Sequence, residues 1–214
     1  MAQIGLTAAV FLPKVLGDGT LEPSVTFTDE ATTANATRTE YQITAATKRY
    51  WDKSVAVTVK VNAVTVSPDQ YVIQHAGGVV VFAVARGVGA VVIVSGKSYA
   101  NMIEVAGFYE WSFDAQKSFE EYTNFGSQGW EEVLPLAKSW KATAQWYWAD
   151  KRFFDALDQG WPLVAALYLD KGTAKTRLEG AIEIESVSFK SPTKGIVKET
   201  INLRGSGAFA YRAG

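Results

Sequence analysis

Two pairs of adjacent glutamates near the middle of the chain are the first candidates for chemistry. They are Glu120 with Glu121 and Glu131 with Glu132, and Trp130 precedes the second pair. Two carboxylates at a fixed separation beside an aromatic ring could cleave a glycosidic bond. However, adjacent residues of an extended chain point to opposite sides, and no neighbouring residue indicates a carboxylic acid in an apolar pocket. We therefore expect solvated charges in a loop and no catalytic residue.

Three tryptophans, Trp140, Trp146 and Trp148, are the second candidates, because exposed indole rings can stack on sugars. Together with Ala142 and Ala144 they occupy every second position from 140 to 148, and polar residues lie between them. This period of two is that of a half-buried strand, so we expect the tryptophans to pack in a core. A Trp-rich β-sandwich that binds carbohydrate is the alternative function.

A short helix is predicted directly after that strand, where the apolar period changes. Asp150 is predicted to cap its first free amides, and Gly160 suits a left-handed end. Phe153, Phe154 and Leu157 share a face in such a helix, so we predict that all three pack in the core.

The chain divides into three predicted parts. Residues 1–40 have few bulky apolar side chains and are predicted to form an extended arm. Residues 41–100 are predicted to form a module of β-hairpins, an antiparallel meander. Residues 101–214 are predicted to form an antiparallel β-sandwich or barrel-like core with the helix near residues 150–158. Within this core, residues 114–135 carry glycines and paired acids and are predicted to be a long loop.

The valine alternation in the hairpin module predicts one turn in particular. Val59 and Val61 alternate with polar residues, and Val64 and Val66 resume the alternation. The two residues between them occupy the position of a two-residue hairpin turn.

Composition excludes several classes of function. The 214 residues carry a net charge of −1, so a broad grip on nucleic acid phosphates or on a membrane surface is not expected. The chain has no cysteine and one histidine, which argues against a disulfide framework, a metal site or a bound cofactor. No secretion signal or membrane-spanning segment is expected, because no basic residue precedes the first apolar run and the longest apolar run is too short.

Six segments of the second half form an ordered pattern with characteristic spacing. They read FYEWSFD at 108–114, YTNFGSQGWEEVLP at 122–135, SWKATAQWYW at 139–148, RFFDALDQG at 152–160, VAALYL at 164–169 and KSPTKGIVKETINLRGSGAFAY at 190–211. In this order they resemble the tail tube, or major tail, proteins of long-tailed bacteriophages. YQITAATKRYWD at 41–52 looks like the start of the β-rich N-terminal extension of some members, and Ala63 departs from the Gly that related hairpins commonly have.

The resemblance implies a structural virion protein. In this family a β-sandwich with one helix assembles as a hexameric ring, and stacked rings form the hollow tail tube through which DNA passes during ejection. The partners it implies are other copies of the chain, a tape-measure protein, tail terminator and distal tail proteins, and DNA that is not read by sequence. The implied location is the tail of a phage or gene transfer agent, after assembly in the host cytoplasm.

The resemblance also gives the acidic residues a role. Glu179, Glu183 and Glu185 lie on one face of a predicted strand and are candidates for an acidic lumen surface that repels DNA phosphates. The alternative is that they are solvated or pair across the hairpin with Lys198 and Arg204.

The long loop and the N-terminal arm are the candidates for contacts between rings. The candidate loop residues are Glu120, Glu121, Asn124, Trp130, Glu131 and Glu132. A tube protein of a contractile or secretion apparatus is the third possible function.

Overall fold

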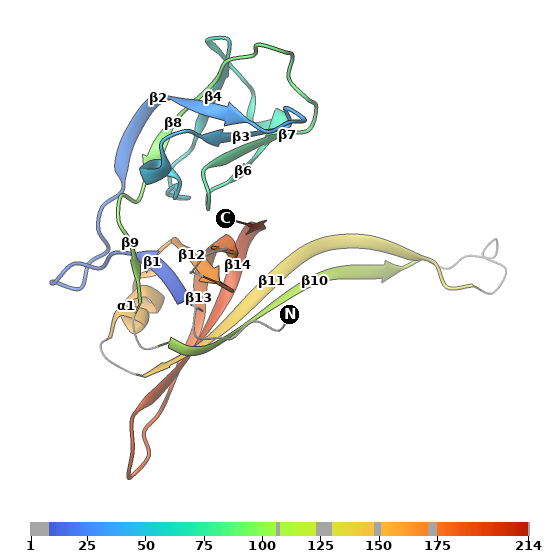
Figure 1. The fold of residues 1–214 in the computed structure, drawn as a ribbon. Helices are drawn as coiled ribbons and strands as arrows, with labels where there is room; N and C mark the ends of the chain where they lie inside the picture. Colours follow the sequence, from blue (N-terminus) through green and yellow to red (C-terminus); the bar gives the residue numbers. More distant parts are fainter. Residues whose placement is uncertain (1–8, 106–107, 123–129, 148–150, 171–174, 214) are drawn as a thin grey trace.

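The computed structural model describes residues 9–105, 108–122, 130–147, 151–170 and 175–213. These residues form two antiparallel seven-stranded sheets and one short α-helix (Figure 1). The prediction of a mainly β protein with one helix is therefore confirmed. The first sheet is curled, at the top of Figure 1, and the second carries two long hairpins that project from its body.

The first sheet is built from the N-terminal half of the chain. Across the sheet the strands are β5 (Val64–Thr65), β4 (Thr58–Val61), β8 (Val92–Ser98), β2 (Val25–Ala34), β3 (Glu40–Ile43), β7 (Val79–Phe82) and β6 (Tyr71–Gln74). Two 3-10 helices lie in its connections, η2 (Ala46–Lys48) and η3 (Pro68–Gln70). β2 and β8 separate strands that are successive in the sequence, so the module is not the simple meander that we predicted.

A two-residue turn joins β4 to β5 at the predicted position. Asn62 and Ala63 have φ angles of 50° and 66°, the left-handed values that a type I′ hairpin turn requires. The Asn62 Oδ1 accepts a hydrogen bond of 3.0 Å from the backbone N–H of Val91, which ties the turn to the start of β8.

The first sheet curls because β2 bends. β2 pairs with β8 along its first part and with β3 along its last part, and its register with β8 shifts between Phe27 and Glu30. The curled sheet encloses a core that contains Trp51, which has no exposed surface. The Trp51 Nε1 donates a hydrogen bond of 2.8 Å to the backbone oxygen of Lys48, so the buried indole has its polar partner.

The second sheet contains the long strands of the C-terminal half. Across the sheet the strands are β10 (Phe108–Glu121), β11 (Val133–Tyr147), β14 (Lys198–Arg212), β13 (Arg177–Lys190), β12 (Leu163–Tyr168), β1 (Ala9–Pro13) and β9 (Met102–Glu104). β12 is buried on both faces, as its continuous apolar run predicts.

The tryptophans of β11 form the centre of the core beneath this sheet. Trp140 and Trp146 are 4% and 1% exposed, so the prediction that they pack in the core is confirmed. The Trp146 ring lies 4.9 Å from the ring of Phe153 on the helix. The third predicted core tryptophan, Trp148, lies outside the described residues.

Trp140 is seated in a gap that glycines leave in the neighbouring strands. A Cβ atom at Gly180 or Gly205 would overlap the Trp140 indole, so any side chain there would displace the ring. Gly180 pairs with Phe209 while Ile182 pairs with Gly205, so two steps of β13 face four steps of β14. This bulge in β14 makes room for the indole, whose Nε1 donates a hydrogen bond of 2.8 Å to the backbone oxygen of Gly207.

The predicted helix is present as α1 (Arg152–Gln159), and it packs against the second sheet. Gly160 ends it in the left-handed conformation with φ 62° and ψ 43°, as predicted, and its N–H bonds to the oxygen of Ala156. The predicted capping residue, Asp150, lies outside the described residues.

One residue of the predicted apolar face of α1 is not in the core. Phe153 and Ala156 are buried, at 2% and 3% exposed, and Leu157 is half-buried. Phe154 is 52% exposed, so the prediction that it packs in the core is wrong. Phe154 lies about 100° around the helix from Phe153, and an eight-residue helix that touches a sheet along one narrow stripe cannot bury both.

The prediction of an extended arm over residues 1–40 is wrong for its described part. β1 pairs with both β12 and β9 in the second sheet, and β2 lies in the middle of the first sheet. The segment can form strands although it has few bulky apolar residues, because other elements supply most of the side chains in the cores against which these strands pack. Val10, Leu12 and Phe27 are its main buried contributions.

The predicted loop over residues 114–135 is also shorter than expected. β10 continues to Glu121 and β11 begins at Val133, so the two strands pair far beyond the body of the sheet. The sequence pattern did not predict these paired strands, because this part of the hairpin has no buried face and therefore no apolar alternation.

Candidate functional site

The outer part of the β10–β11 hairpin is a two-stranded projection, which we call the arm (residues 115–122 and 130–139; Figure 1). β14 pairs with β11 only over residues 141–147, so β11 within the arm has β10 as its sole neighbour among the described strands. Every residue of β11 from 133 to 139 is exposed, whereas residues 140–146 alternate between buried and less buried positions.

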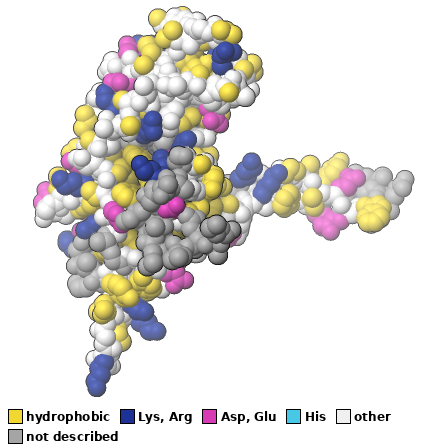
Figure 2. All heavy atoms as spheres, viewed as in Figure 1, with side chains coloured by type: hydrophobic (Ala, Val, Ile, Leu, Met, Phe, Trp, Pro, Cys, Tyr) yellow, Lys and Arg dark blue, Asp and Glu magenta, His cyan; other side chains and the backbone are white. Residues whose placement is uncertain are grey.

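Large apolar side chains cover the arm. The exposed fractions are 57% for Phe119, 79% for Trp130, 48% for Leu134 and 52% for Leu136. Figure 2 shows apolar side chains along the arm, with acidic side chains near its outer end. Phe119 pairs with Pro135, whereas Leu134 pairs with Glu120, so exposed apolar side chains lie on both faces of the ribbon. Exposed apolar side chains gathered on a ribbon with no packed face mark an interaction surface.

The acidic candidates lie at the outer end of the arm. Glu120 and Glu121 are the last residues of β10, and Glu131 and Glu132 precede β11, so the first pair lies on a strand and not in a loop as predicted. The ends are joined by a backbone hydrogen bond of 2.7 Å from the N–H of Tyr122 to the oxygen of Glu132. All four glutamates are exposed.

Of the two other members of the predicted loop set, the structure describes one. Trp130 is exposed beside the acidic residues, and Asn124 lies outside the described residues. We call the outer end of the arm, residues 119–122 and 130–134, the acidic tip.

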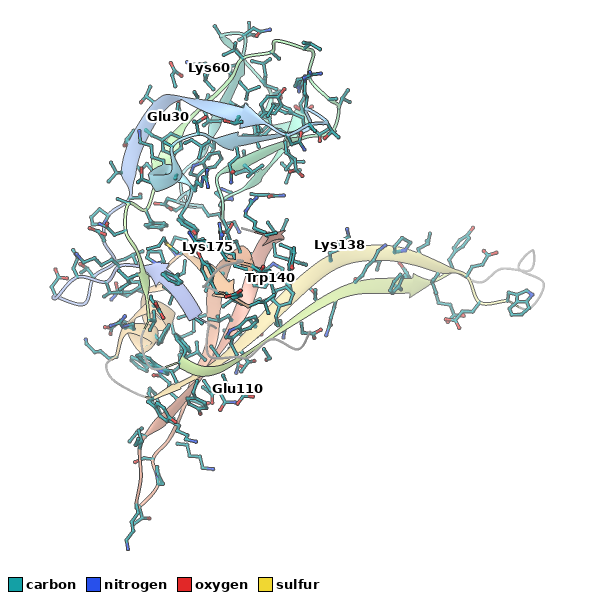
Figure 3. The ribbon with its side chains drawn as sticks, viewed as in Figure 1. Glu30, Lys60, Glu110, Lys138, Trp140 and Lys175 are labelled. Carbon is teal, nitrogen blue, oxygen red and sulfur yellow. The ribbon has the colours of Figure 1, made fainter. Side chains whose placement is uncertain are left out.

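An open hollow of about 780 Å³ lies where the arm leaves the body of the sheet. Three strands line it: β10 with Ala115–Lys117, β11 with Lys138–Trp140, and β14 with Arg204, Gly205 and residues 207–209. Lys117 and Lys138 are paired directly across the two strands and both line the hollow, and the Lys117 Nζ lies 5.6 Å from the ring centroid of Phe119. We call this feature the basic hollow; Figure 3 labels Lys138 and Trp140 on its β11 wall.

A second hairpin projects from the other end of the sheet, between β13 and β14 (Figure 1). Its outer end exposes Phe189 and Ile196, at 51% and 61%, and pairs Lys190 directly with Lys198. Lys194 lies in the exposed connection between the strands. We call this end, residues 188–198, the lysine tip. It was not among the predicted contact residues, because its Pro and Gly indicate a turn and nothing in its sequence indicates a contact.

The three carboxylates predicted to share an acidic face are separated by the structure. Glu183 and Glu185 are exposed, and Glu185 lies 3.9 Å from Arg204 and 3.5 Å from Lys141, so the weighed pairing with Arg204 is present. Glu179 is 1% exposed and cannot line an open surface, so the prediction for this residue is wrong. The register shift between Gly180 and Ile182 breaks the strict alternation on which the prediction relied.

Glu179 instead lies in a buried ionic cluster where the two sheets meet. Arg212 Nε donates a hydrogen bond of 2.6 Å to Glu179 Oε2, and Arg177 Nε donates to Oε1. The Tyr50 hydroxyl, from the first module, donates at 3.3 Å to Oε1, and Arg212 reaches Gln74 Oε1 at 3.3 Å. Burial, together with the Glu179 carboxylate, raises the pKa of the Tyr50 hydroxyl. The cluster fixes the first module on the second sheet.

No arrangement of a metal centre is visible in the described ranges. Among them, no group of three or more His, Asp or Glu side chains is placed to hold a metal ion. No helix of the described residues is long and apolar enough to cross a lipid bilayer.

Comparisons with known proteins find likeness in structure alone. No protein-family model matches the sequence, and no curated protein matches it significantly. The structure is similar to a chain from the tail of an empty gene transfer agent particle with C6 symmetry, at 17% sequence identity and a TM-score of 0.45, over 52% of this chain and 87% of that chain.

Two further solved structures are similar over the same share of the chain. A chain from the virion of a native gene transfer agent particle is 17% identical with a TM-score of 0.45, over 52% of this chain and 89% of that chain. A chain of the SPP1 tail tube is 15% identical with a TM-score of 0.42, over 53% and 69%. The chain thus has structural matches to chains of gene transfer agent particles and of the SPP1 tail tube over about half its length, at low sequence identity.

Proposed function

We propose that this chain is the structural subunit of a tail tube in a phage or a phage-like particle. Copies form rings, six to a ring by the sequence resemblance, and the rings stack into a hollow conduit for DNA. The observation that carries the proposal is the arm, a ribbon of paired strands with exposed apolar side chains and no packed face in the single chain.

The arm needs a covering surface for a physical reason. A two-stranded hairpin without a packed face is only marginally stable in water. Burying one exposed Phe, Leu or Trp side chain is worth about 1.5–3 kcal/mol, and four of them lie on the arm. A partner that covers these side chains therefore gains affinity and makes the arm rigid.

The edges of the second sheet support repeated association of identical chains. Among the described strands, β10 and β9 each have one neighbour, so each leaves a row of backbone groups available at the edge. An edge of this kind can pair with a strand of another chain. Contacts between different surfaces of identical subunits close into rings or extend as filaments, and a tube uses both.

The remaining parts of the proposal follow from the resemblance. Glu183 and Glu185, which are exposed, remain candidates for an acidic lumen surface facing DNA in transit. A tape-measure protein inside the tube, and terminator and distal tail proteins at its ends, are the further partners we propose. The place of action is the virion tail, after assembly in the host cytoplasm.

The alternative of carbohydrate binding loses its main support. Trp140 and Trp146 are buried, so neither indole offers a face to a sugar ring. The exposed Trp130 lies among other apolar side chains of the arm, which favours a protein partner.

Electron microscopy of the purified full-length chain at high concentration tests the proposal. We expect rings or tubes from the natural chain, and a folded protein without tubes from the triple variant Phe119→Ser, Leu134→Ser and Leu136→Ser. A matched control replaces three valines of the first module by serine: Val64, Val72 and Val84, which are 69%, 60% and 72% exposed and so more exposed than the three arm residues. The control variant should still form tubes.

Two results would contradict the proposal. The first is a natural chain that stays monomeric at every concentration and is retained on a polysaccharide column. The second is a triple arm variant that forms tubes as readily as the natural chain.

A further inference from the structure

We propose that the basic hollow of one copy is the receptor for the acidic tip of a second copy. This inference rests on the proposed function, in that it requires the chain to associate with itself. It adds the identity of both contacting surfaces and the direction in which copies join.

The receptor carries unbalanced positive charge on apolar walls. Lys117 and Lys138 face each other across neighbouring strands, an arrangement that is unfavourable when no anion lies between or above them. Arg204 also lines the hollow, but it pairs across the strands with Lys141 and its guanidinium lies 3.9 Å from Glu185, so the unpaired positive charge of the hollow comes from the two lysines. Ala115 and Phe209 provide apolar lining, and Phe209 is 36% exposed. The hollow thus suits a ligand that is both acidic and apolar.

The acidic tip has that composition. Between residues 118 and 137 the sequence contains four glutamates and no lysine or arginine. The same stretch exposes Trp130 and Tyr122, at 79% and 54%. Aromatic side chains supply much of the binding energy at protein interfaces, while charges around them provide specificity and orientation.

The contact must join different copies. Val133 at the tip and Lys138 at the hollow are five residues apart on the same strand, which is about 17 Å of extended chain. The tip cannot fold back onto the hollow without breaking the pairing of β10 with β11. Because the tip and the hollow are different surfaces, each copy can donate its tip to one neighbour and receive the tip of another. Such a contact propagates, as a tube requires.

Two other arrangements compete with this one. The lysine tip also carries three lysines and exposed apolar residues, but it is a projecting end and offers no concave surface to a second projecting end. A nucleic acid backbone would prefer a surface of cations alone, whereas the basic hollow combines two lysines with the apolar lining of Ala115, Trp140 and Phe209.

A charge-reversal exchange tests the proposal by sedimentation velocity and electron microscopy. The receptor variant is Lys117→Glu with Lys138→Glu, and the tip variant is Glu120→Lys with Glu131→Lys. We expect each to weaken assembly at least tenfold at low salt, because like charges then meet at the contact. Combining all four substitutions in one chain should restore assembly, since the charges are again complementary.

The control variant reverses the lysine tip, with Lys190→Glu and Lys194→Glu. It should assemble as the natural chain does, and it should not rescue the tip variant. Circular dichroism and thermal melting of every variant verify folding; the receptor pair keeps two like charges opposite each other, so its stability should stay close to that of the natural chain.

The outcomes separate this inference from the proposed function. If the natural chain forms no assemblies, the proposed function fails. If it assembles and the receptor variant assembles equally well, or if the lysine-tip reversal rescues the tip variant, the basic hollow is not the receptor. Binding of a duplex DNA fragment that is lost in the receptor variant while assembly is unchanged would assign the hollow to nucleic acid and overturn the inference.

Discussion

The two halves of β11 follow the same chain and have opposite surroundings. In the inner half, Trp140 and Trp146 are almost fully buried and alternate with polar residues. In the outer half, residues 133–139 are all exposed, and among the described strands only β10 pairs with the segment that carries Leu134 and Leu136. The inner half thus belongs to the core of the second sheet, whereas the outer half exposes the side chains that, in the proposed function, a second copy covers.

The same contrast separates the charged residues of the second sheet. Glu179 lies in a buried cluster with two arginines and a tyrosine, while the glutamates of the acidic tip are exposed. The sheet thus buries two carboxylates, Glu179 and Glu199, the second of which accepts a hydrogen bond from Trp146 Nε1, and exposes others at the end of the arm. The division is tested by substituting the same residue type once in the buried environment and once in the exposed environment.

The largest effect is expected for tryptophan. Trp140→Ala should lower the free energy of unfolding by about 3–5 kcal/mol, because it removes a buried indole and leaves a cavity between Gly180 and Gly205. Trp130→Ala, on the arm, should change it by less than about 0.5 kcal/mol. Urea denaturation followed by fluorescence measures both values. Equal losses would refute the division between a stabilising and a binding half.

The next effect concerns the buried ionic cluster. Glu179→Gln should lower the free energy of unfolding by about 3 kcal/mol, because two partly buried arginines lose their common, fully buried anion. The matched change Glu185→Gln, at a half-exposed carboxylate with ion pairs of 3.5 and 3.9 Å, should cost less than about 1 kcal/mol.

The position of the first module provides a second readout for Glu179→Gln. Because Tyr50 and Gln74 contact the cluster, hydrogen exchange should rise in β6 more than in β4, which lies on the far side of the first sheet. An unchanged exchange pattern would show that the cluster does not hold the module.

The smallest expected effect is an increase in stability, and it concerns the β4–β5 turn of the first module. Ala63 has a φ of 66°, which an L-residue adopts at a cost and glycine adopts freely. Ala63→Gly should therefore raise the free energy of unfolding by about 0.5–1 kcal/mol and leave assembly unchanged. Thermal melting and sedimentation measure the two quantities; a loss of stability would mean that the turn is not of the type we describe.

The sequence predicted those elements whose pattern is local. The inner half of β11, the β4–β5 turn, the end of α1 at Gly160 and the doubly buried β12 each follow from a short-range signal. In each case one buried face, one turn geometry or one helix end determines the residues of a few consecutive positions.

The features that the sequence did not reveal depend on distant partners. Glu179 is buried because Arg212 and Tyr50, from distant parts of the chain, meet it. β1 joins the second sheet across a long separation in sequence, and the arm is paired without any apolar alternation. Phe154 is exposed because the sheet covers only a narrow stripe of α1. Such features are set by tertiary packing, which local periodicity does not encode.

Disulfide trapping tests the central claim, that the acidic tip of one copy docks in the basic hollow of another. The chain has no cysteine, so Val133→Cys at the acidic tip and Gln116→Cys at the basic hollow introduce the only thiols. Gln116 pairs with Ser139, six residues from Val133, so the two sites lie about 20 Å apart in one chain and cannot be bridged within it.

We predict that mild oxidation of this double variant under assembly conditions gives a ladder of covalent oligomers on a reducing-agent-free gel. Val133→Cys alone should give at most a dimer, and Val133→Cys with Thr193→Cys, at the lysine tip, should give no ladder. A ladder from the Thr193 pair, or none from the Gln116 pair while tubes are visible by electron microscopy, would contradict the account.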